Sequence, residues 1–146
     1  MAEASKTIEI KASIKDCYKV ISDYESYPEF LKETKSITIG KKSGKTVEVT
    51  YELDLIKAIR YTLKITENAP HGLSWTLVKG DMMKSNTGSW ELEEIDKHTT
   101  RATYNIDIGL GLLVPGSVAK MLVSSSLPAM MEAFKKRIES TVKKKK

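Results

Sequence analysis

Residues 46–55 read TVEVTYELDL, a stretch in which apolar and polar side chains alternate without exception. Every odd position from Val47 to Leu55 is apolar, and every even position from Thr46 to Asp54 is polar. Because successive side chains of a β-strand point to opposite faces, this pattern predicts a strand with one buried and one exposed face.

The same two-residue period extends over most of the chain between Ile37 and Ile108. Its further apolar positions are Ile59, Tyr61, Leu63 and Ile65, then Leu73, Trp75 and Leu77, then Trp90 and Leu92, and finally Tyr104, Ile106 and Ile108. Turn residues at 68–72 and 80–81 separate these runs, and Lys6–Ala12 predicts a short strand before them. The connections are too short for parallel crossovers, so the sequence predicts an antiparallel sheet.

Two short helices are expected after the first strand. Ser13 stands three residues before Asp16, a variant of the capping box that predicts a helix start, and the helix should end near Asp23. Tyr24–Leu31 predicts a shorter helix interrupted by Pro28. Cys17 lies on the apolar stripe of the first helix with no charge evident beside it to lower its pKa, so we interpret it as a core residue and not as a nucleophile.

The only segment that predicts a long helix runs from Val114 to Val142, and its apolar stripe changes sides near Pro128. Val118, Met121, Leu122, Ser125 and Ala129 share one face, whereas Leu127, Met130, Met131, Phe134 and Ile138 share nearly the opposite one. Proline removes a helical hydrogen bond, so either the helix kinks around Ser124–Leu127 or a helix begins there with Pro128 in its first turn.

A sheet this large with one long helix to cover it indicates an α+β fold and suggests an internal cavity. The helix segment before Pro128 is rich in small residues, namely Gly116, Ser117, Ala119, Ser124, Ser125 and Ser126. They either leave a gap beneath the helix or simply allow its close approach to the sheet.

Composition and charge favour one globular domain in the cytoplasm. The chain has 146 residues, of which 40% are hydrophobic and 29% charged. No apolar run approaches the roughly 18 residues of a membrane-spanning helix, Met1–Lys11 lacks the apolar centre of a secretion signal, and a single cysteine forms no internal disulfide.

The net charge of +5 has its origin in a basic tail. Lys143–Lys146 supply four of the 24 basic residues, which leaves 20 against 19 acidic residues in the rest of the chain. The tail is either a solvated helix end, where cations suit the helix dipole, or a contact for anionic membranes or an RNA backbone.

No catalytic, metal or cofactor site is predicted. His71 and His98 fall in predicted turns, no metal-ligand spacing or phosphate-binding loop is present, and nothing nearby would activate the serines at 124–126. The candidate ligand-binding residues face the predicted cavity: Tyr51, Leu53, Tyr61, Leu63, Trp75, Leu77, Trp90, Tyr104, Ile106, Val118, Met121, Leu122, Ser125 and Ala129. The polar tips of the tyrosines, tryptophans and Ser125 either reach the ligand or belong to ordinary core packing.

The chain also resembles the START/Bet v 1-like superfamily, in its bacterial polyketide cyclase-like and coenzyme Q-binding-like branch. The resemblance covers nearly the whole chain. It rests on the first strand and helix and on Ile21, Asp23, Tyr24, Tyr27, Pro28, Glu29, Phe30 and Leu31 of a D-x-x-x-Y-P-x-F-L stretch; Gly88 and Trp90 of a G-x-W step; Thr100 and Tyr104; Leu113–Gly116; Leu127 and Pro128; and Glu132–Arg137. It implies a helix-grip fold, in which a seven-stranded antiparallel sheet wraps a long C-terminal helix around a hydrophobic pocket.

The sequence therefore predicts one START-like domain at residues 1–142 and a basic tail at 143–146. We expect nonenzymatic binding or transport of a lipid, quinone or isoprenoid-like molecule. A polyketide aromatase/cyclase or dehydratase is one alternative, because relatives of that kind are thought to act mainly by shaping a chain inside such a pocket. A ribosome- or polyanion-associating protein is another. The expected partner is the hydrophobic ligand. Peripheral contact with an anionic membrane through Lys143, Lys144, Lys145 and Lys146 is left open beside the solvated helix end; nucleic acid is not expected, and no oligomeric state is predicted.

Overall fold

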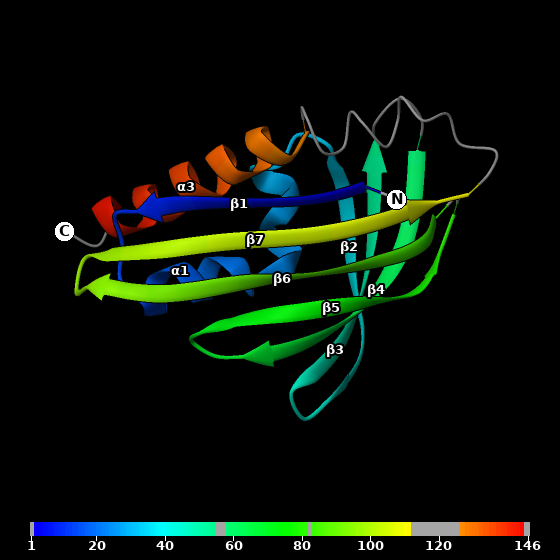
Figure 1. Ribbon diagram of the computed structural model, residues 1–146, viewed down its shortest axis with the longest axis horizontal. Coiled ribbons are helices and arrows are strands. Elements are labelled where there is room, and N and C mark those ends of the chain that lie inside the picture. The colour runs from blue at the N-terminus through cyan, green and yellow to red at the C-terminus, as the bar shows by residue number, and fades with distance from the viewer. Residues whose placement is uncertain (1, 55–57, 82, 112–125, 145–146) are drawn as a thin grey trace.

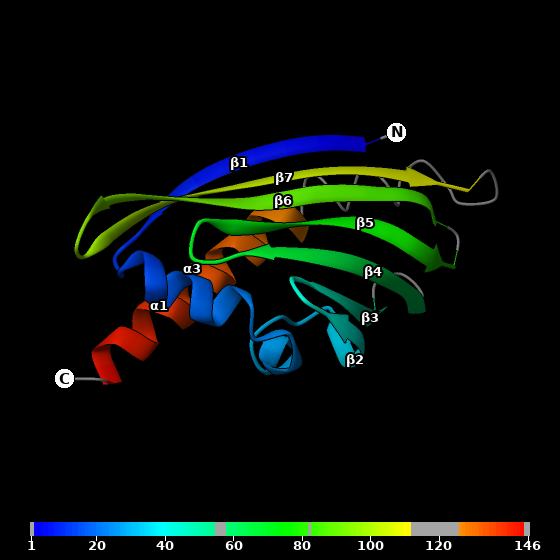
Figure 2. The ribbon, with the colours of Figure 1, turned by 90° about the horizontal axis from the view of Figure 1, so that it is seen from below.

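A curved antiparallel sheet carries all the described helices on one of its faces, as the computed structural model shows (Figures 1 and 2). The structure describes residues 2–54, 58–81, 83–111 and 126–144. The strands are β1 Ala2–Ile10, β2 Thr34–Ser43, β3 Thr46–Asp54, β4 Ala58–Asn68, β5 Gly72–Gly80, β6 Met83–Asp96 and β7 Thr99–Leu110. The helices are α1 Ile14–Ile21, the 3-10 helix η1 Tyr24–Glu29, and α3 Leu127–Lys144.

The sheet is seven-stranded with the order β1-β7-β6-β5-β4-β3-β2, and every pair of neighbours is antiparallel. Strands β2 to β7 follow one another as a meander, and β1 joins its far side by pairing with β7, from Ala2 opposite Ile108 to Ile10 opposite Thr100. This long pairing explains why β1 begins four residues earlier than predicted. The predicted α+β helix-grip architecture is confirmed.

The alternation in residues 46–54 produces the predicted half-buried strand. Val47, Val49 and Tyr51 are buried in β3, whereas the intervening residues are partly or fully exposed. On the opposite face Thr50 and Thr62 pair their hydroxyl groups across β3 and β4 at 2.8 Å. Leu55 lies outside the described residues.

The predicted capping box starts α1. The Ser13 hydroxyl accepts a hydrogen bond from the backbone N–H of Asp16 at 3.1 Å. The helix buries Ile14, Cys17 and Ile21 against the sheet and α3. Burial raises the pKa of the Cys17 thiol to about 11, so the interpretation of Cys17 as a core residue is confirmed.

The second predicted helix exists as the 3-10 helix η1 and contains Pro28, as expected. It ends at Glu29, two residues before the predicted end. His71 and His98 lie in turns, also as expected.

Helix α3 packs lengthwise over one end of the sheet (Figure 2). Its buried residues Leu127, Met131, Phe134 and Ile138 recur at spacings of four, three and four, which places them on one helix face. Full burial of each such side chain contributes roughly 1.5–3 kcal/mol. Pro128 lies in the first turn of α3, as one of the two predicted arrangements required. The predicted kink at Ser124–Leu127 lies mostly outside the described residues.

Candidate ligand-binding site

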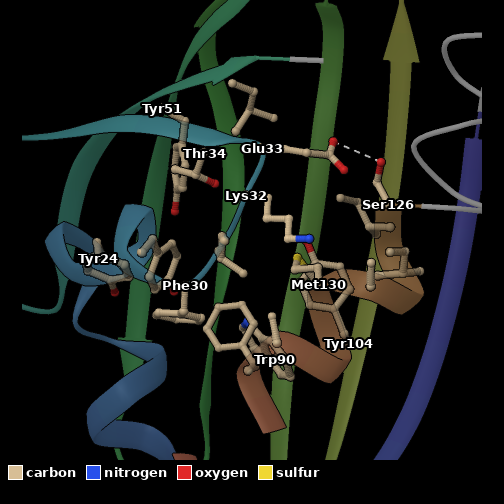
Figure 3. Close-up of a pocket in the computed structure, with 18 of the residues that line it drawn as sticks. Tyr24, Phe30, Lys32, Glu33, Thr34, Tyr51, Trp90, Tyr104, Ser126 and Met130 are labelled. Atoms are coloured by element: carbon tan, nitrogen blue, oxygen red, sulfur yellow. Dashed lines mark hydrogen bonds between the residues drawn. The ribbon is translucent and has the colours of Figure 1, made fainter. Parts of the chain in front are cut away.

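A cavity of about 830 Å³ lies between the concave face of the sheet and α3 (Figure 3). This volume falls in the range of roughly 300–1,000 Å³ that is typical of small-molecule sites. The exposed side chains around it, among them Lys32, Ala129 and Glu132, come from the turn before β2 and from α3. A mouth of the cavity therefore lies between these two segments.

Most of the predicted site residues within the described part of the chain line this cavity. They are Tyr51, Leu53, Tyr61, Leu63, Trp75, Trp90, Tyr104, Ile106 and Ala129. Leu77 instead packs, partly buried, beside the core. Val118, Met121, Leu122 and Ser125 lie outside the described residues. The role of all these residues in binding stays a prediction. For the nine described residues that line the cavity, the structure places the side chains where a ligand would contact them.

Phe134 of α3 closes one end of the cavity with an aromatic cluster. Its ring packs edge-on against Tyr27 at 5.2 Å, Phe30 at 5.1 Å and Trp90 at 5.1 Å between ring centroids. The side chain is only 1% exposed. Phe134 thus joins η1, α3 and β6 at the boundary between the solid core and the cavity.

Three tyrosine hydroxyls supply polar groups to the apolar wall. Tyr51 stacks on Tyr61 with ring centroids 5.2 Å apart, and Tyr104 packs between Trp75 and Trp90. Within the described residues, none of the three hydroxyls hydrogen-bonds to another group. Burial above all raises the pKa of each phenol well beyond its ordinary value. The hydroxyls therefore stay neutral near neutral pH and can donate hydrogen bonds to a ligand.

Asn86 places a buried amide in the same wall. Its Oδ1 accepts a hydrogen bond from Trp75 Nε1 at 2.9 Å, and its Nδ2 contacts Met83 Sδ at 3.6 Å. An indole N–H only donates, so the contact with Trp75 fixes which way the amide points. A Cβ on Gly88 would come within 2.4 Å of the Trp75 ring. The glycine of the G-x-W step is thus needed to seat Trp75 over β6.

The mouth carries charged and hydrogen-bonded side chains. Ser126 donates a hydrogen bond to Glu33 Oε2 at 3.1 Å, which links the start of α3 to the turn before β2 (Figure 3). Arg137 pairs with Glu29 and lies over the Phe30 ring, 5.2 Å from its centroid. These contacts hold the two sides of the mouth together.

Several lining residues were missed from the sequence, chiefly Tyr24, Tyr27, Phe30, Lys32, Glu33, Asn86, Met130 and Phe134. A signal existed for Asn86, because counting back from Trp90 in steps of two reaches Gly88 and Asn86 on the same strand face. Lys32 and Glu33 lie between periodic segments, so no local pattern indicates where their side chains point.

Neither a metal site nor a membrane-spanning helix is found in the residues that the structure describes. No three histidine, cysteine, aspartate or glutamate side chains come together there in a way that would hold a metal ion. None of the described helices has the length and apolar character needed to span a membrane.

Solved structures share this architecture over almost the entire chain. A START superfamily protein from Mycobacterium smegmatis superposes with a TM-score of 0.86 at 21% identity, over 97% of this chain and 99% of that one. The Zhui aromatase/cyclase from Streptomyces sp. R1128 gives a TM-score of 0.86 at 15% identity, over 96% and 94%. At such identities these likenesses show the fold alone.

At the level of sequence, a family model matches the chain, although no curated protein does. The family model described as polyketide cyclase/dehydrase and lipid transport matches residues 1–142. With its helix-grip fold and its hollow, aromatic-lined sheet, the chain belongs to this START-like family.

Proposed function

We propose that this protein binds and carries a hydrophobic small molecule without changing it chemically. The observation that carries the proposal is the cavity of about 830 Å³, whose strand-derived walls contain no charged side chain among the described residues. Burial of apolar ligand surface at roughly 25 cal/mol per Å² would supply most of the affinity. The family description, which includes lipid transport, agrees with this function.

The proposed ligand is a lipid, quinone or isoprenoid-like molecule with at least one oxygen that accepts hydrogen bonds. Neutral phenols at Tyr51, Tyr61 and Tyr104 lack protein partners within the described residues and would donate to such an oxygen. A wholly saturated hydrocarbon would leave these donors without partners, which costs binding energy.

A second candidate, a polyketide aromatase/cyclase, is favoured by the carboxylate of Glu33 and the guanidinium of Arg137 in the cavity lining. Both groups already have protein partners, Ser126 and Glu29. The phenols stay neutral near neutral pH, since burial raises their pKa. We therefore place binding first. Conversion of an added aromatic polyketide precursor by the purified protein would reverse this order.

The test combines extraction with a binding assay. Mass spectrometry of organic extracts from the purified protein should detect a copurifying hydrophobic molecule. The neutral fluorophore N-phenyl-1-naphthylamine should become brighter on titration, and the extracted molecule should displace it. Absence of fluorophore binding by a folded protein, shown by circular dichroism, would refute the proposal.

The proposal also covers the domain, the tail and the compartment. We assign ligand binding to residues 1–142 and peripheral contact with anionic membranes to the basic tail at 143–146, of which Lys143 and Lys144 continue α3. A reducing cytoplasm suits the buried, free Cys17.

A further inference from the structure

Charge is distributed unevenly around the cavity. Among the described lining residues, the charged side chains are Lys32, Glu33, Glu132, Lys136 and Arg137. All five come from the turn before β2 or from α3, whereas the strands contribute none. A ligand in this cavity therefore meets charge only at the mouth.

Lys32 is the cation that extends across this mouth. Its side chain reaches from the turn before β2 toward Met130 on α3, with the ammonium directed over the cavity (Figure 3). No ion pair or hydrogen bond joins the ammonium to another described residue. The ammonium carries three donors and no acceptor, so it is available to an acceptor or anion from outside.

The neighbouring acidic groups do not neutralise it. Glu33, next in sequence, accepts its hydrogen bond from Ser126, and Glu29 pairs with Arg137. Glu132 is exposed on α3 and makes no ion pair with Lys32. The mouth thus holds its guanidinium in a protein contact. The ammonium groups of Lys32 and Lys136 have no ion pair with a described residue, and of these two lysines Lys32 is the one whose side chain extends over the cavity in Figure 3.

We propose that Lys32 binds the anionic group of an amphiphilic ligand whose apolar body lies among the tyrosines and tryptophans of the cavity. This inference rests on the proposed binding function and narrows its ligand to an amphiphile with a carboxylate or phosphate at one end. Lys32 then sets ligand orientation, with the anion at the mouth and the apolar end inside.

Two naphthalene probes separate the charge from the apolar body. N-phenyl-1-naphthylamine is neutral, and 8-anilinonaphthalene-1-sulfonate adds a sulfonate to the same ring system. We expect Lys32→Met to weaken binding of the anionic probe by about threefold to fivefold, measured as its Kd. This is the effect expected from losing one solvent-accessible charge pair. The neutral probe should bind to the variant as it does to the parent, because methionine preserves the apolar part of the lysine side chain.

Lys35→Met is the matched control. Lys35 lies three residues away, is exposed, pairs with Glu52 at 3.9 Å and does not line the cavity. This variant lowers the net charge equally and should leave both probes unaffected. Equal weakening of the anionic probe by Lys32→Met and Lys35→Met would overturn the proposal, because the effect would then be one of net charge. So would a larger loss with Lys136→Met.

Displacement of the neutral probe by C12 amphiphiles identifies the anion. Dodecanoate or dodecyl phosphate should displace it from the parent at lower concentration than dodecanol, and Lys32→Met should remove this advantage. Preference for dodecanoate would indicate a fatty-acid-like ligand, and preference for dodecyl phosphate a lipid phosphate. No advantage of either anion overturns the inference about Lys32. Failure of the neutral probe to bind the parent would instead overturn the proposed function.

Discussion

The two ends of the sheet have the same strand pattern but are filled differently. At the end covered by α1 and α3, Ile10, Cys17, Ile21, Thr100 and Ile138 all have 0% exposure. Toward the other end, the inward-facing side chains of β3, β4 and β7 line the cavity. We call these regions the packed end and the hollow end.

The comparison shows that a strand's apolar face does not specify what covers it. At the packed end, Thr100 donates a hydrogen bond to the Ala12 carbonyl at 2.8 Å, and the Lys11 backbone N–H donates to Glu139 of α3 at 2.9 Å. These contacts seat the helices on the sheet. The hollow end has a mouth bridged by Ser126 and Glu33, and the described aromatic side chains behind it line the cavity without filling it.

The largest effect is expected from a truncation at the packed end. Ile138→Ala should lower the free energy of unfolding by about 2–5 kcal/mol, because the closed packing around it leaves a void. Ile106→Ala, at the hollow end, should cost about 1 kcal/mol, since its side chain already borders empty space. Urea denaturation measures both. Equal losses would mean that the hollow end is as tightly packed as the other.

Substitution by larger side chains should also affect the packed end more than the hollow end. Cys17→Met at the packed end should cost about 1–3 kcal/mol through overpacking. Ile106→Trp should change stability by less than about 1 kcal/mol, because the indole has room, and it should reduce uptake of N-phenyl-1-naphthylamine. Unchanged uptake in a folded Ile106→Trp protein would place the ligand elsewhere.

Removing the buried amide of Asn86 at the hollow end should lower the free energy of unfolding by nearly as much as Cys17→Met does. Asn86→Leu leaves Trp75 Nε1 without its acceptor, and a buried unsatisfied donor costs about 1–3 kcal/mol. Asn105→Leu removes a partly exposed amide that accepts a hydrogen bond from Ser5 and donates to Ser89 and Glu91. Because water can replace these partners at the surface, the loss should be less than about 1 kcal/mol. Denaturation followed by tryptophan fluorescence compares them. A smaller loss from Asn86→Leu would show that Trp75 finds another partner.

Cys17 provides a pH test of the packed end. Its pKa is raised from 9.0 to about 11 in the folded protein, so the thiol ionises more readily after unfolding. Its contribution is fully present below about pH 9 and is lost as pH rises toward 11. The stability difference between the parent and Cys17→Ala should therefore shrink by about 2 kcal/mol from pH 7 to pH 10.5. Other titrating groups cancel in this difference, and a constant difference would indicate an accessible thiolate.

The smallest effect on stability is expected beyond both ends, at the basic tail. Deleting Lys143–Lys146 should change the free energy of unfolding by no more than about 0.5 kcal/mol. It should weaken sedimentation with acidic liposomes, and the difference should fade at high salt. Equal sedimentation with and without the tail would favour a merely solvated helix end.

Much of the fold was predictable because its signals are local. The alternation in β3, the Ser13 cap of α1 and the turn at residues 69–71 each depend on neighbouring residues, and each appears where the sequence placed it. The candidate site was predictable only in its strand residues. Tyr51, Tyr61 and Tyr104 share an inward face by period, which is how they were found.

Other site residues depend on contacts between distant segments. Lys32 and Glu33 lie in a turn, and only the approach of α3, 93 residues along the chain from Glu33 to Ser126, makes them part of the mouth. Asn86 reads as one polar residue in a strand until Trp75 of the neighbouring strand donates to it. Phe134 was assigned to a helix face, but its position between Tyr27, Phe30 and Trp90 follows from how the helices seat on the sheet.

The sequence by itself determined the strands, their inward faces, the first helix cap and the apolar stripe of α3, because each of these follows from side chains a few residues apart. The sequence left open whether a cavity or close helix packing lies beneath the last helix, and tertiary structure alone decided this, together with the charged mouth and the boundary at Phe134. The physical reason is that an apolar face gains by leaving water whether protein or ligand covers it. The curvature of the sheet and the positions of α1 and α3 determine where the protein's own side chains cover the apolar face and where a cavity remains.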